Sequence, residues 1–512
     1  MSNQMQSRHS QNSQPSIFVL VGDCLRAATG DPQTLLRSHS HTDVRFNRCY
    51  SPATWTFPSH ATLHSAAHPT DHDKTRRGES LDQSNSCLPK SAQNHGYRTA
   101  LFSENPTYSS KYGFDKGMDF VDDSINFKYF LSSFSIESHL DNQLTPKTCA
   151  SAFQELLKNS DRARNTANTI YGATKYLTDS NVDDYPHHGD RIAKHISKWA
   201  KTHGSKQRPV FCIANFLDPH EPHYTPPPGM PVGQQLTSEQ YMTLATAWDV
   251  KPYYFDPEQP LPEPARDEFG SWDGVFAAEY DIYTHQIQHF DRCIDTCVTS
   301  LVETFDPLLI ITGDHGQLFG EEGMVRHQTS LHPHGIHVPL LVRFPEKWTE
   351  RATDELQDIS SVVSWYGLSQ ALLEVIDGTI HSAESFIDTV ECESTSGNGT
   401  VFAVADGPTW NTTVLREHDK FDDSLIDKYC TRKIGYMDEN TQTVYECPWD
   451  SDGEGDIDKT VYHLDGNGRA PVSESIEGTE LMDAHRTWLM KQRKDDKLDT
   501  RATSRLKQLG YL

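Results

Sequence analysis

Short apolar runs alternate with longer amphipathic stretches along most of the chain. Five runs bounded by polar or turn residues predict buried β-strands, at 17–21, 99–102, 210–216, 308–311 and 340–344. Apolar residues recur every three or four positions over 276–301, which predicts a helix with one face packed on a flat surface. This alternation predicts an α/β fold with a central, mainly parallel sheet flanked by helices on both faces.

The pattern changes along the chain and suggests three parts. Residues 105–190 are polar and weakly periodic, as expected for insertions around a sheet. Beyond residue 385 the pattern predicts short strands followed by helices, at 401–404, 412–415, 443–445, 461–464, 480–490 and 503–509. We therefore predict a disordered polar tail over 1–15, a main domain over 16–385, and a smaller α+β C-terminal subdomain over 386–512 packed on it.

Composition narrows the classes of partner. With 46 Lys and Arg against 72 Asp and Glu, the net charge is −26, and the mean hydropathy is −0.65. Nucleic acid is excluded as a partner because its phosphates would meet no basic surface. The aromatic content of 10% and the regular apolar runs argue for a folded chain. An acidic surface with few lysines is typical of proteins in concentrated salt, so we expect a halophilic protein.

The sequence also suggests where the protein resides. The first 16 residues lack the apolar region of a secretory signal, and no run reaches the roughly 18 apolar residues of a membrane span. We therefore expect a cytoplasmic protein without a membrane segment. The ten cysteines form no C-x-x-C pair, which argues against a zinc ribbon.

Four local features carry candidate chemistry. They are Gly22-Asp23-Cys24-Leu25-Arg26, Trp55-Thr56-Phe57-Pro58-Ser59-His60, Leu217-Asp218-Pro219-His220-Glu221-Pro222-His223, and Thr312-Gly313-Asp314-His315-Gly316 with His327 beyond it. Asp23 and Asp314 directly follow predicted strands, where sites of parallel sheets form. Two carboxylates and the imidazole of His315 suit Mg²⁺, Mn²⁺, Ca²⁺ or Zn²⁺.

The remaining polar groups complete an ester-hydrolase set. Thr56, at a predicted helix N-terminus, would attack as an alkoxide stabilised by the metal and the helix dipole. His60, His220 and His327 could bind the transferred group or protonate the departing alcohol. Structural alternatives exist for each residue: Asp23 as a turn residue, Thr56 as a helix N-cap, and His220 as a loop histidine.

The four features, in this order, resemble the sulfatase branch of the alkaline phosphatase superfamily, in particular haloarchaeal proteins called sulfatases. The resemblance runs from about residue 17 to 512. It implies an alkaline-phosphatase-like fold with Asp23, Thr56, Asp314 and His315 at a metal. It implies catalytic roles for Thr56, His60, His220 and His327. Val338-Pro339-Leu340 and the terminal Arg505–Leu512 segment also fit the family pattern.

Three departures shape the expected reaction. Sulfatases convert a Cys or Ser in the nucleophile box into formylglycine, and Thr56 cannot yield that aldehyde. His60 stands where the family has Arg, and Cys24 replaces the second Asp of the calcium-binding pair. A phosphothreonine can be cleared by in-line water attack, so a phosphate ester is chemically the easier substrate.

We therefore predict a metal-dependent hydrolase of sulfate or phosphate esters with one divalent metal. Its substrate would be a small anionic ester or a sulfated or phosphorylated glycan. The alternatives are a phosphodiesterase or phosphotransferase of the same superfamily, and a non-catalytic relative that binds anionic glycans. A second metal could use Asp218, His220 and His327, although the Asp-x-x-x-His spacing of two-metal relatives is missing. The oligomeric state stays open.

Overall fold

A computed structural model describes most of the chain. The described residues are 14–27, 43–76, 79–81, 87–123, 189–204, 208–223, 226–249, 260–349, 356–395, 399–407, 431–448, 457–464, 468–472, 485–486 and 488–489. The strand expected at 412–415, the helix expected at 503–509 and most of the helix expected at 480–490 lie outside these residues.

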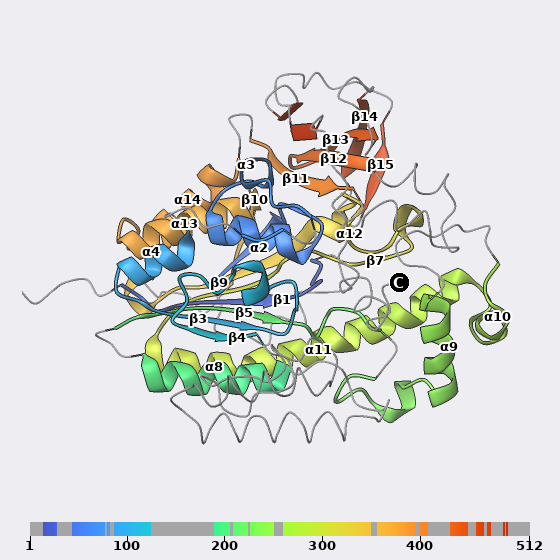
Figure 1. The fold of residues 1–512 in the computed structure, drawn as a ribbon, viewed down its shortest axis with the longest axis horizontal. Coiled ribbons are helices and arrows are strands. Elements are labelled where there is room, and N and C mark those ends of the chain that lie inside the picture. Colours follow the sequence, from blue (N-terminus) through green and yellow to red (C-terminus); the bar gives the residue numbers. More distant parts are fainter. Residues whose placement is uncertain are drawn as a thin grey trace, which may run out of the picture.

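An eight-stranded sheet forms the centre of the molecule (Figure 1). In spatial order it contains β10 (Gln357–Ser364), β2 (Val44–Tyr50), β9 (His337–Arg343), β6 (Leu308–Gly313), β1 (Ile17–Gly22), β5 (Val210–Phe216), β3 (Arg98–Ser103) and β4 (Phe120–Asp122). Strand β9 is antiparallel to both neighbours, and the other pairs are parallel. The sheet is therefore mixed and mainly parallel, as the sequence predicts.

Helices cover both faces of this sheet (Figure 1). One face carries α8 (Gly189–His203) and α11 (Trp272–Phe305), and α9 (Ser238–Asp249) and α10 (Glu263–Phe269) pack on the part of α11 that extends beyond the sheet. The other face carries α2 (Thr56–Ser65), α4 (Leu88–Asn94), α13 (Trp365–Asp377) and α14 (Ala383–Ser394). Along β1, Phe18 and Leu20 pack into the first core, whereas Ile17, Val19 and Val21 pack into the second. Because side chains alternate along a strand, one apolar run supplies both layers.

A second sheet lies beside the main domain. It is five-stranded and antiparallel, with β11 (Val401–Asp406), β12 (Thr431–Met437), β13 (Thr441–Pro448), β14 (Asp458–Leu464) and β15 (Arg469–Pro471) in order. An isolated bridge joins Val404 to Ala53, just before α2. The expected boundary at 385/386 falls inside α14, whose Phe386 and Val390 belong to the main core. The change to the small sheet therefore comes after α14.

Shorter elements occupy the connections. They are α3 (Pro69–His72), α12 (Pro333–Ile336), the hairpin of β7 (Leu318–Phe319) and β8 (Val325–Arg326), and the 3-10 turns Ser110–Tyr112, Val232–Gln234, Glu321–Gly323 and Glu346–Trp348. Within the described part of the chain, no helix combines the length and apolar character that crossing a membrane would require.

Candidate active site

Two carboxylates meet at the ends of neighbouring parallel strands. Asp23 follows β1 and Asp314 follows β6, and Gly22 is in register with Gly313. Both side chains are fully buried. The close approach depends on Gly313, since a Cβ there would lie 2.2 Å from the carbonyl oxygen of Leu25. The sheet thus places the two predicted ligands side by side.

Backbone contacts fix Asp314 and His315. Asp314 Oδ1 accepts hydrogen bonds from the amides of Cys24, at 3.1 Å, and His315, at 3.0 Å. His315 Nδ1 lies 2.9 Å from the carbonyl oxygen of Gly316, which assigns the proton to Nδ1 and leaves Nε2 as an acceptor. Burial lowers the pKa of His315 to about 4, although the negative charge of Asp23 acts to raise it. The imidazole is therefore neutral, as a ligand must be.

Thr56 is the first residue of α2 and faces this group. Its Oγ1 lies 3.2 Å from His315 Nε2 and 3.5 Å from each oxygen of Asp23. The N-cap residue of α2 is Trp55, whose side chain makes no capping hydrogen bond. The alternative interpretation of Thr56 as the N-cap is therefore wrong.

Two asparagines that no sequence motif indicates complete the polar cluster. Asn105 Nδ2 donates to Asp23 Oδ2 at 2.7 Å and to Thr56 Oγ1 at 3.1 Å. Asn215 Nδ2 lies 3.2 Å from Asp23 Oδ2. Asn215 could have been found, because it is a polar residue inside the apolar run of β5. Asn105 lies in a loop without such a signal.

His60 is on α2 and lies next to the carboxylate of Asp314. It is fully buried, and its ring stacks on Tyr108 with the centroids 3.7 Å apart. His60 Nε2 lies 3.3 Å from Asn215 Nδ2 and 3.8 Å from Asp314 Oδ2. Burial, followed by the neighbouring His64 and His315, lowers the pKa of His60 well below its usual value.

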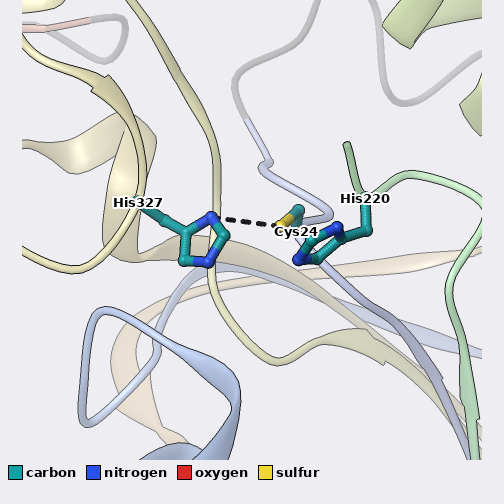
Figure 2. A group of neighbouring side chains, drawn as sticks. All are labelled: Cys24, His220 and His327. Carbon is teal, nitrogen blue, oxygen red and sulfur yellow. Dashed lines mark hydrogen bonds between the residues drawn. The ribbon is translucent and has the colours of Figure 1, made fainter. Parts of the chain in front are cut away.

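His220 and His327 gather around Cys24 (Figure 2). Cys24 Sγ lies 3.6 Å from His327 Nδ1 and 3.6 Å from Asp23 Oδ1, and the two histidine rings are 5.3 Å apart. His220 Nδ1 contacts the carbonyl oxygen of Glu221 at 2.7 Å. Both histidines are about 6% exposed. The two rings thus lie together on the side of the site that carries Cys24.

Asp218 does not join this cluster. Its Oδ1 lies 2.5 Å from Nδ1 of His289 on α11, and these two group with Cys293. The second metal site considered for Asp218, His220 and His327, which the missing Asp-x-x-x-His spacing already disfavoured, therefore lacks its carboxylate. A loop that turns sharply after β5 separates Asp218 from His220, which the sequence spacing could not reveal.

The spacing of the first group fits a divalent cation. His315 Nε2 has oxygens of Thr56, Asp314 and Asp23 at 3.2, 3.4 and 3.6 Å. Ligand atoms around one such ion lie roughly 3–3.6 Å apart. Asp314 Oδ2 has no hydrogen-bond partner among the described residues. Burial and the carboxylate of Asp23 raise the pKa of Asp314 well above its usual value, and a cation between them would offset this repulsion.

The sequence comparisons identify the family. The family model described as sulfatase matches residues 17–370. The chain belongs to the sulfatase family. This assignment makes it a relative of ester hydrolases that typically bind a divalent metal. No curated protein matches the sequence of this sulfatase-family chain.

Solved structures show the same fold at low identity. A phosphonate monoester hydrolase of Agrobacterium radiobacter has a TM-score of 0.55 and 16% identity, covering 88% of this chain and 89% of its own. A putative sulfatase from Bacteroides thetaiotaomicron has a TM-score of 0.54 and 14% identity, with 96% of both chains covered. A 2-O GAG sulfatase has a TM-score of 0.52 and 14% identity, covering 93% of this sulfatase-family chain and 91% of its own. At these identities the likeness establishes the fold.

Proposed function

We propose that this chain is a metal-dependent hydrolase of phosphate, phosphonate or sulfate esters in which Thr56 is the nucleophile. The observation that carries the proposal is the position of Thr56 Oγ1. It is buried at the start of α2 within 3.5 Å of both Asp23 oxygens and His315 Nε2, and it serves no capping role. A hydroxyl held among carboxylates and a neutral imidazole is suited to nucleophilic attack.

Asp23, Thr56, Asp314 and His315 would hold the cation. Bound there, a divalent ion would withdraw charge from the ester and stabilise the alkoxide form of Thr56. Asn105 Nδ2 donates to Thr56 Oγ1 and would also stabilise that oxygen as charge develops on it. The N-terminus of α2 adds a favourable partial charge. Both oxygens of Asp23 lie 3.5 Å from Thr56 Oγ1, and this carboxylate can accept the proton of the hydroxyl.

His220 and His327 would bind the oxygens of the anionic group and protonate the departing alcohol. Both are buried beside Cys24, on the same side of the site. His60 would act through Asn215 and Asp314, because its ring nitrogen faces these two groups. We therefore assign His60 as a positioning residue. A phosphoryl or phosphonyl group on Thr56 would then be removed by water.

One assay panel tests this proposal. The purified chain, in concentrated KCl with Mg²⁺, Mn²⁺, Ca²⁺ or Zn²⁺, is given an aryl sulfate, an aryl phosphate, a bis-aryl phosphate and an aryl phosphonate. We expect Thr56→Ala to lower kcat by about 10³-fold or more on the substrate that turns over. Thr62→Ala, which removes another buried hydroxyl from α2, is the matched control and should stay close to wild type.

The same panel separates the alternatives. An acid quench should trap one phosphoryl group on the peptide that contains Thr56. Equal rates from wild type and Thr56→Ala would reject the nucleophile. No turnover of any ester, with metal still bound, would favour a protein that only binds anionic glycans. Glycerol that diverts the product without changing donor consumption would identify a phosphotransferase.

A further inference from the structure

A second group of metal-ligating side chains lies between β5 and α11. Asp218 follows β5 after one residue, and His289 and Cys293 are four residues apart on α11. One ligand atom from each lies within 4.8 Å of the other two. All three residues are buried. None of them belongs to the set proposed above for the catalytic metal.

We propose that Asp218, His289 and Cys293 form a Zn²⁺ site that fastens the segment carrying His220 to α11. One carboxylate oxygen, one imidazole nitrogen and one thiolate sulfur make a mixed set that suits zinc rather than Ca²⁺ or Mg²⁺. Two ligands four residues apart project from the same face of a helix. The site does not depend on the proposed catalytic function.

One of the two distances matches a tetrahedral zinc centre, and the other is a hydrogen-bond distance that the ion would have to lengthen. Zinc bonds of about 2.3 Å to sulfur and about 2.0 Å to nitrogen and oxygen separate S and N by roughly 3.6 Å, and N and O by roughly 3.3 Å. Cys293 Sγ lies 3.6 Å from His289 Nδ1. Asp218 Oδ1 lies 2.5 Å from the same nitrogen. The carboxylate and the ring would therefore separate by about 0.8 Å on binding the ion.

A cavity borders the two ligands from α11 and gives the ion access to them. It has a volume of about 390 Å³ and lies beside α8 and α11, where His289 and Cys293 form part of its wall with Lys194 and Arg292. The cavity can hold a water molecule as the fourth ligand, which is the coordination of zinc sites with three protein ligands.

The neighbouring contacts explain what such a site would do. Segment 218–223 carries His220 and is already tied to α11 through Gln286. That side chain contacts His223 Nδ1 at 2.6 Å and donates to the carbonyl oxygen of Pro222 at 3.1 Å. A zinc ion at Asp218 would add a second attachment at the start of the segment. It would thereby fix the position from which His220 enters the active site.

The experiment uses the full chain with Cys24→Ser as the parent, so that the thiol of the active site does not contribute. The metal-free protein is titrated with Co²⁺ and then with Zn²⁺. We expect a thiolate-to-cobalt charge-transfer band in the near ultraviolet that Zn²⁺ abolishes. Cys293→Ser should lose this band and one equivalent of metal, and so should His289→Ala. Cys297→Ser, which changes another buried thiol of α11, should keep both.

Two further measurements keep the outcome decisive. Circular dichroism establishes that each variant is folded. Amide hydrogen exchange of residues 217–223 should become slower when Zn²⁺ is added to the parent, and should not change when it is added to Cys293→Ser. A parent without the band, or a band that survives Cys293→Ser, would overturn the site. If Cys293→Ser loses one equivalent of bound metal and Asp314→Asn loses none, the result would support this zinc site. It would at the same time reject the metal proposed for the active site.

Discussion

Asn105 joins the two groups on which the proposed chemistry depends. One amide nitrogen donates to Asp23 Oδ2 at 2.7 Å and to Thr56 Oγ1 at 3.1 Å, and the side chain is almost fully buried. Asn105 Oδ1 in turn accepts from the amide of Thr107 at 2.7 Å, which fixes the orientation of the carboxamide. Asn105 therefore sets the position of both a proposed ligand and the proposed nucleophile.

Removing this amide should impair both metal binding and turnover. Partners that orient a metal ligand are worth about 10–100-fold in affinity or activity, and we expect a loss in this range for Asn105→Ala. Isothermal titration with the activating metal and kcat/KM for the best ester measure the two effects. Asn94→Ala, an exposed position at the end of α4, is the control. Unchanged metal affinity in Asn105→Ala would contradict the assigned role.

His64 predicts a dependence of stability on pH. It is fully buried on α2, with Nε2 2.7 Å from the hydroxyl of Tyr108, and burial lowers its pKa to about 3. The unfolded chain takes up a proton near pH 6.5, whereas the folded chain takes it up near pH 3. Stability is therefore complete above about pH 6.5 and falls with decreasing pH between these values.

The protonation of His64 should change the free energy of unfolding by about 1.4 kcal/mol per pH unit between pH 3 and 6.5. Urea unfolding at several pH values should show that His64→Gln reduces the slope by about this amount. His381→Gln, at an exposed position, should leave the slope unchanged. An identical slope in wild type and His64→Gln would reject a neutral, buried His64.

At the level of elements, the site depends on how closely β1 and β6 approach beyond their carboxyl ends. A Cβ at Gly313 would lie 2.2 Å from the carbonyl oxygen of Leu25, a distance that requires backbone movement. The loop after β1 carries Asp23 and Cys24, and the one after β6 carries Asp314 and His315. Close packing of these loops brings the four side chains to one point.

Gly313→Ala should therefore separate these loops. We expect it to lower the free energy of unfolding by about 1–3 kcal/mol, as overpacking of a core does, and to weaken metal binding as well. Gly233→Ala is the control, because a Cβ there meets no atom within 4 Å. Chemical denaturation and metal titration measure both quantities. Wild-type metal affinity in Gly313→Ala would show that the site tolerates this separation.

At the level of the whole molecule, the dominant property is a net charge of −26. Like charges repel in the folded state, and salt screens this repulsion. The proposed substrate is also an anion, so positive charge must be local. The proposed cation and the donors of His220 and His327 would supply it at the active site.

We propose that the chain is adapted to concentrated salt, and predict that its Tm rises with KCl between 0.1 and 3 M, on the order of several degrees. Differential scanning calorimetry measures the shift. Sucrose, which stabilises proteins without screening charge, should not reproduce the increase at low KCl. A Tm that is constant or falls with KCl would contradict this adaptation.

The sequence by itself determined the layers of the fold and predicted that Asp23 and Asp314 would lie together. Apolar runs predicted β1, β3, β5, β6 and β9, and the 3.6-residue period predicted α11, because burial imposes these patterns locally. Strands such as β2 and β12, which mix charged and apolar residues, carry a weaker signal. Asp23 and Asp314 could be paired because adjacent parallel strands end at the same edge.

Only the tertiary structure showed that Asn105 and Asn215 also surround those carboxylates and that Asp218 lies elsewhere. Asn105 reaches Asp23 from a loop 82 residues away in sequence, and Asp218 pairs with His289 across 71 residues. No local pattern encodes such contacts, since each depends on where loops turn after the strands are packed. Local burial and periodicity therefore specify the scaffold, whereas the partners of each functional side chain are fixed only when distant segments meet.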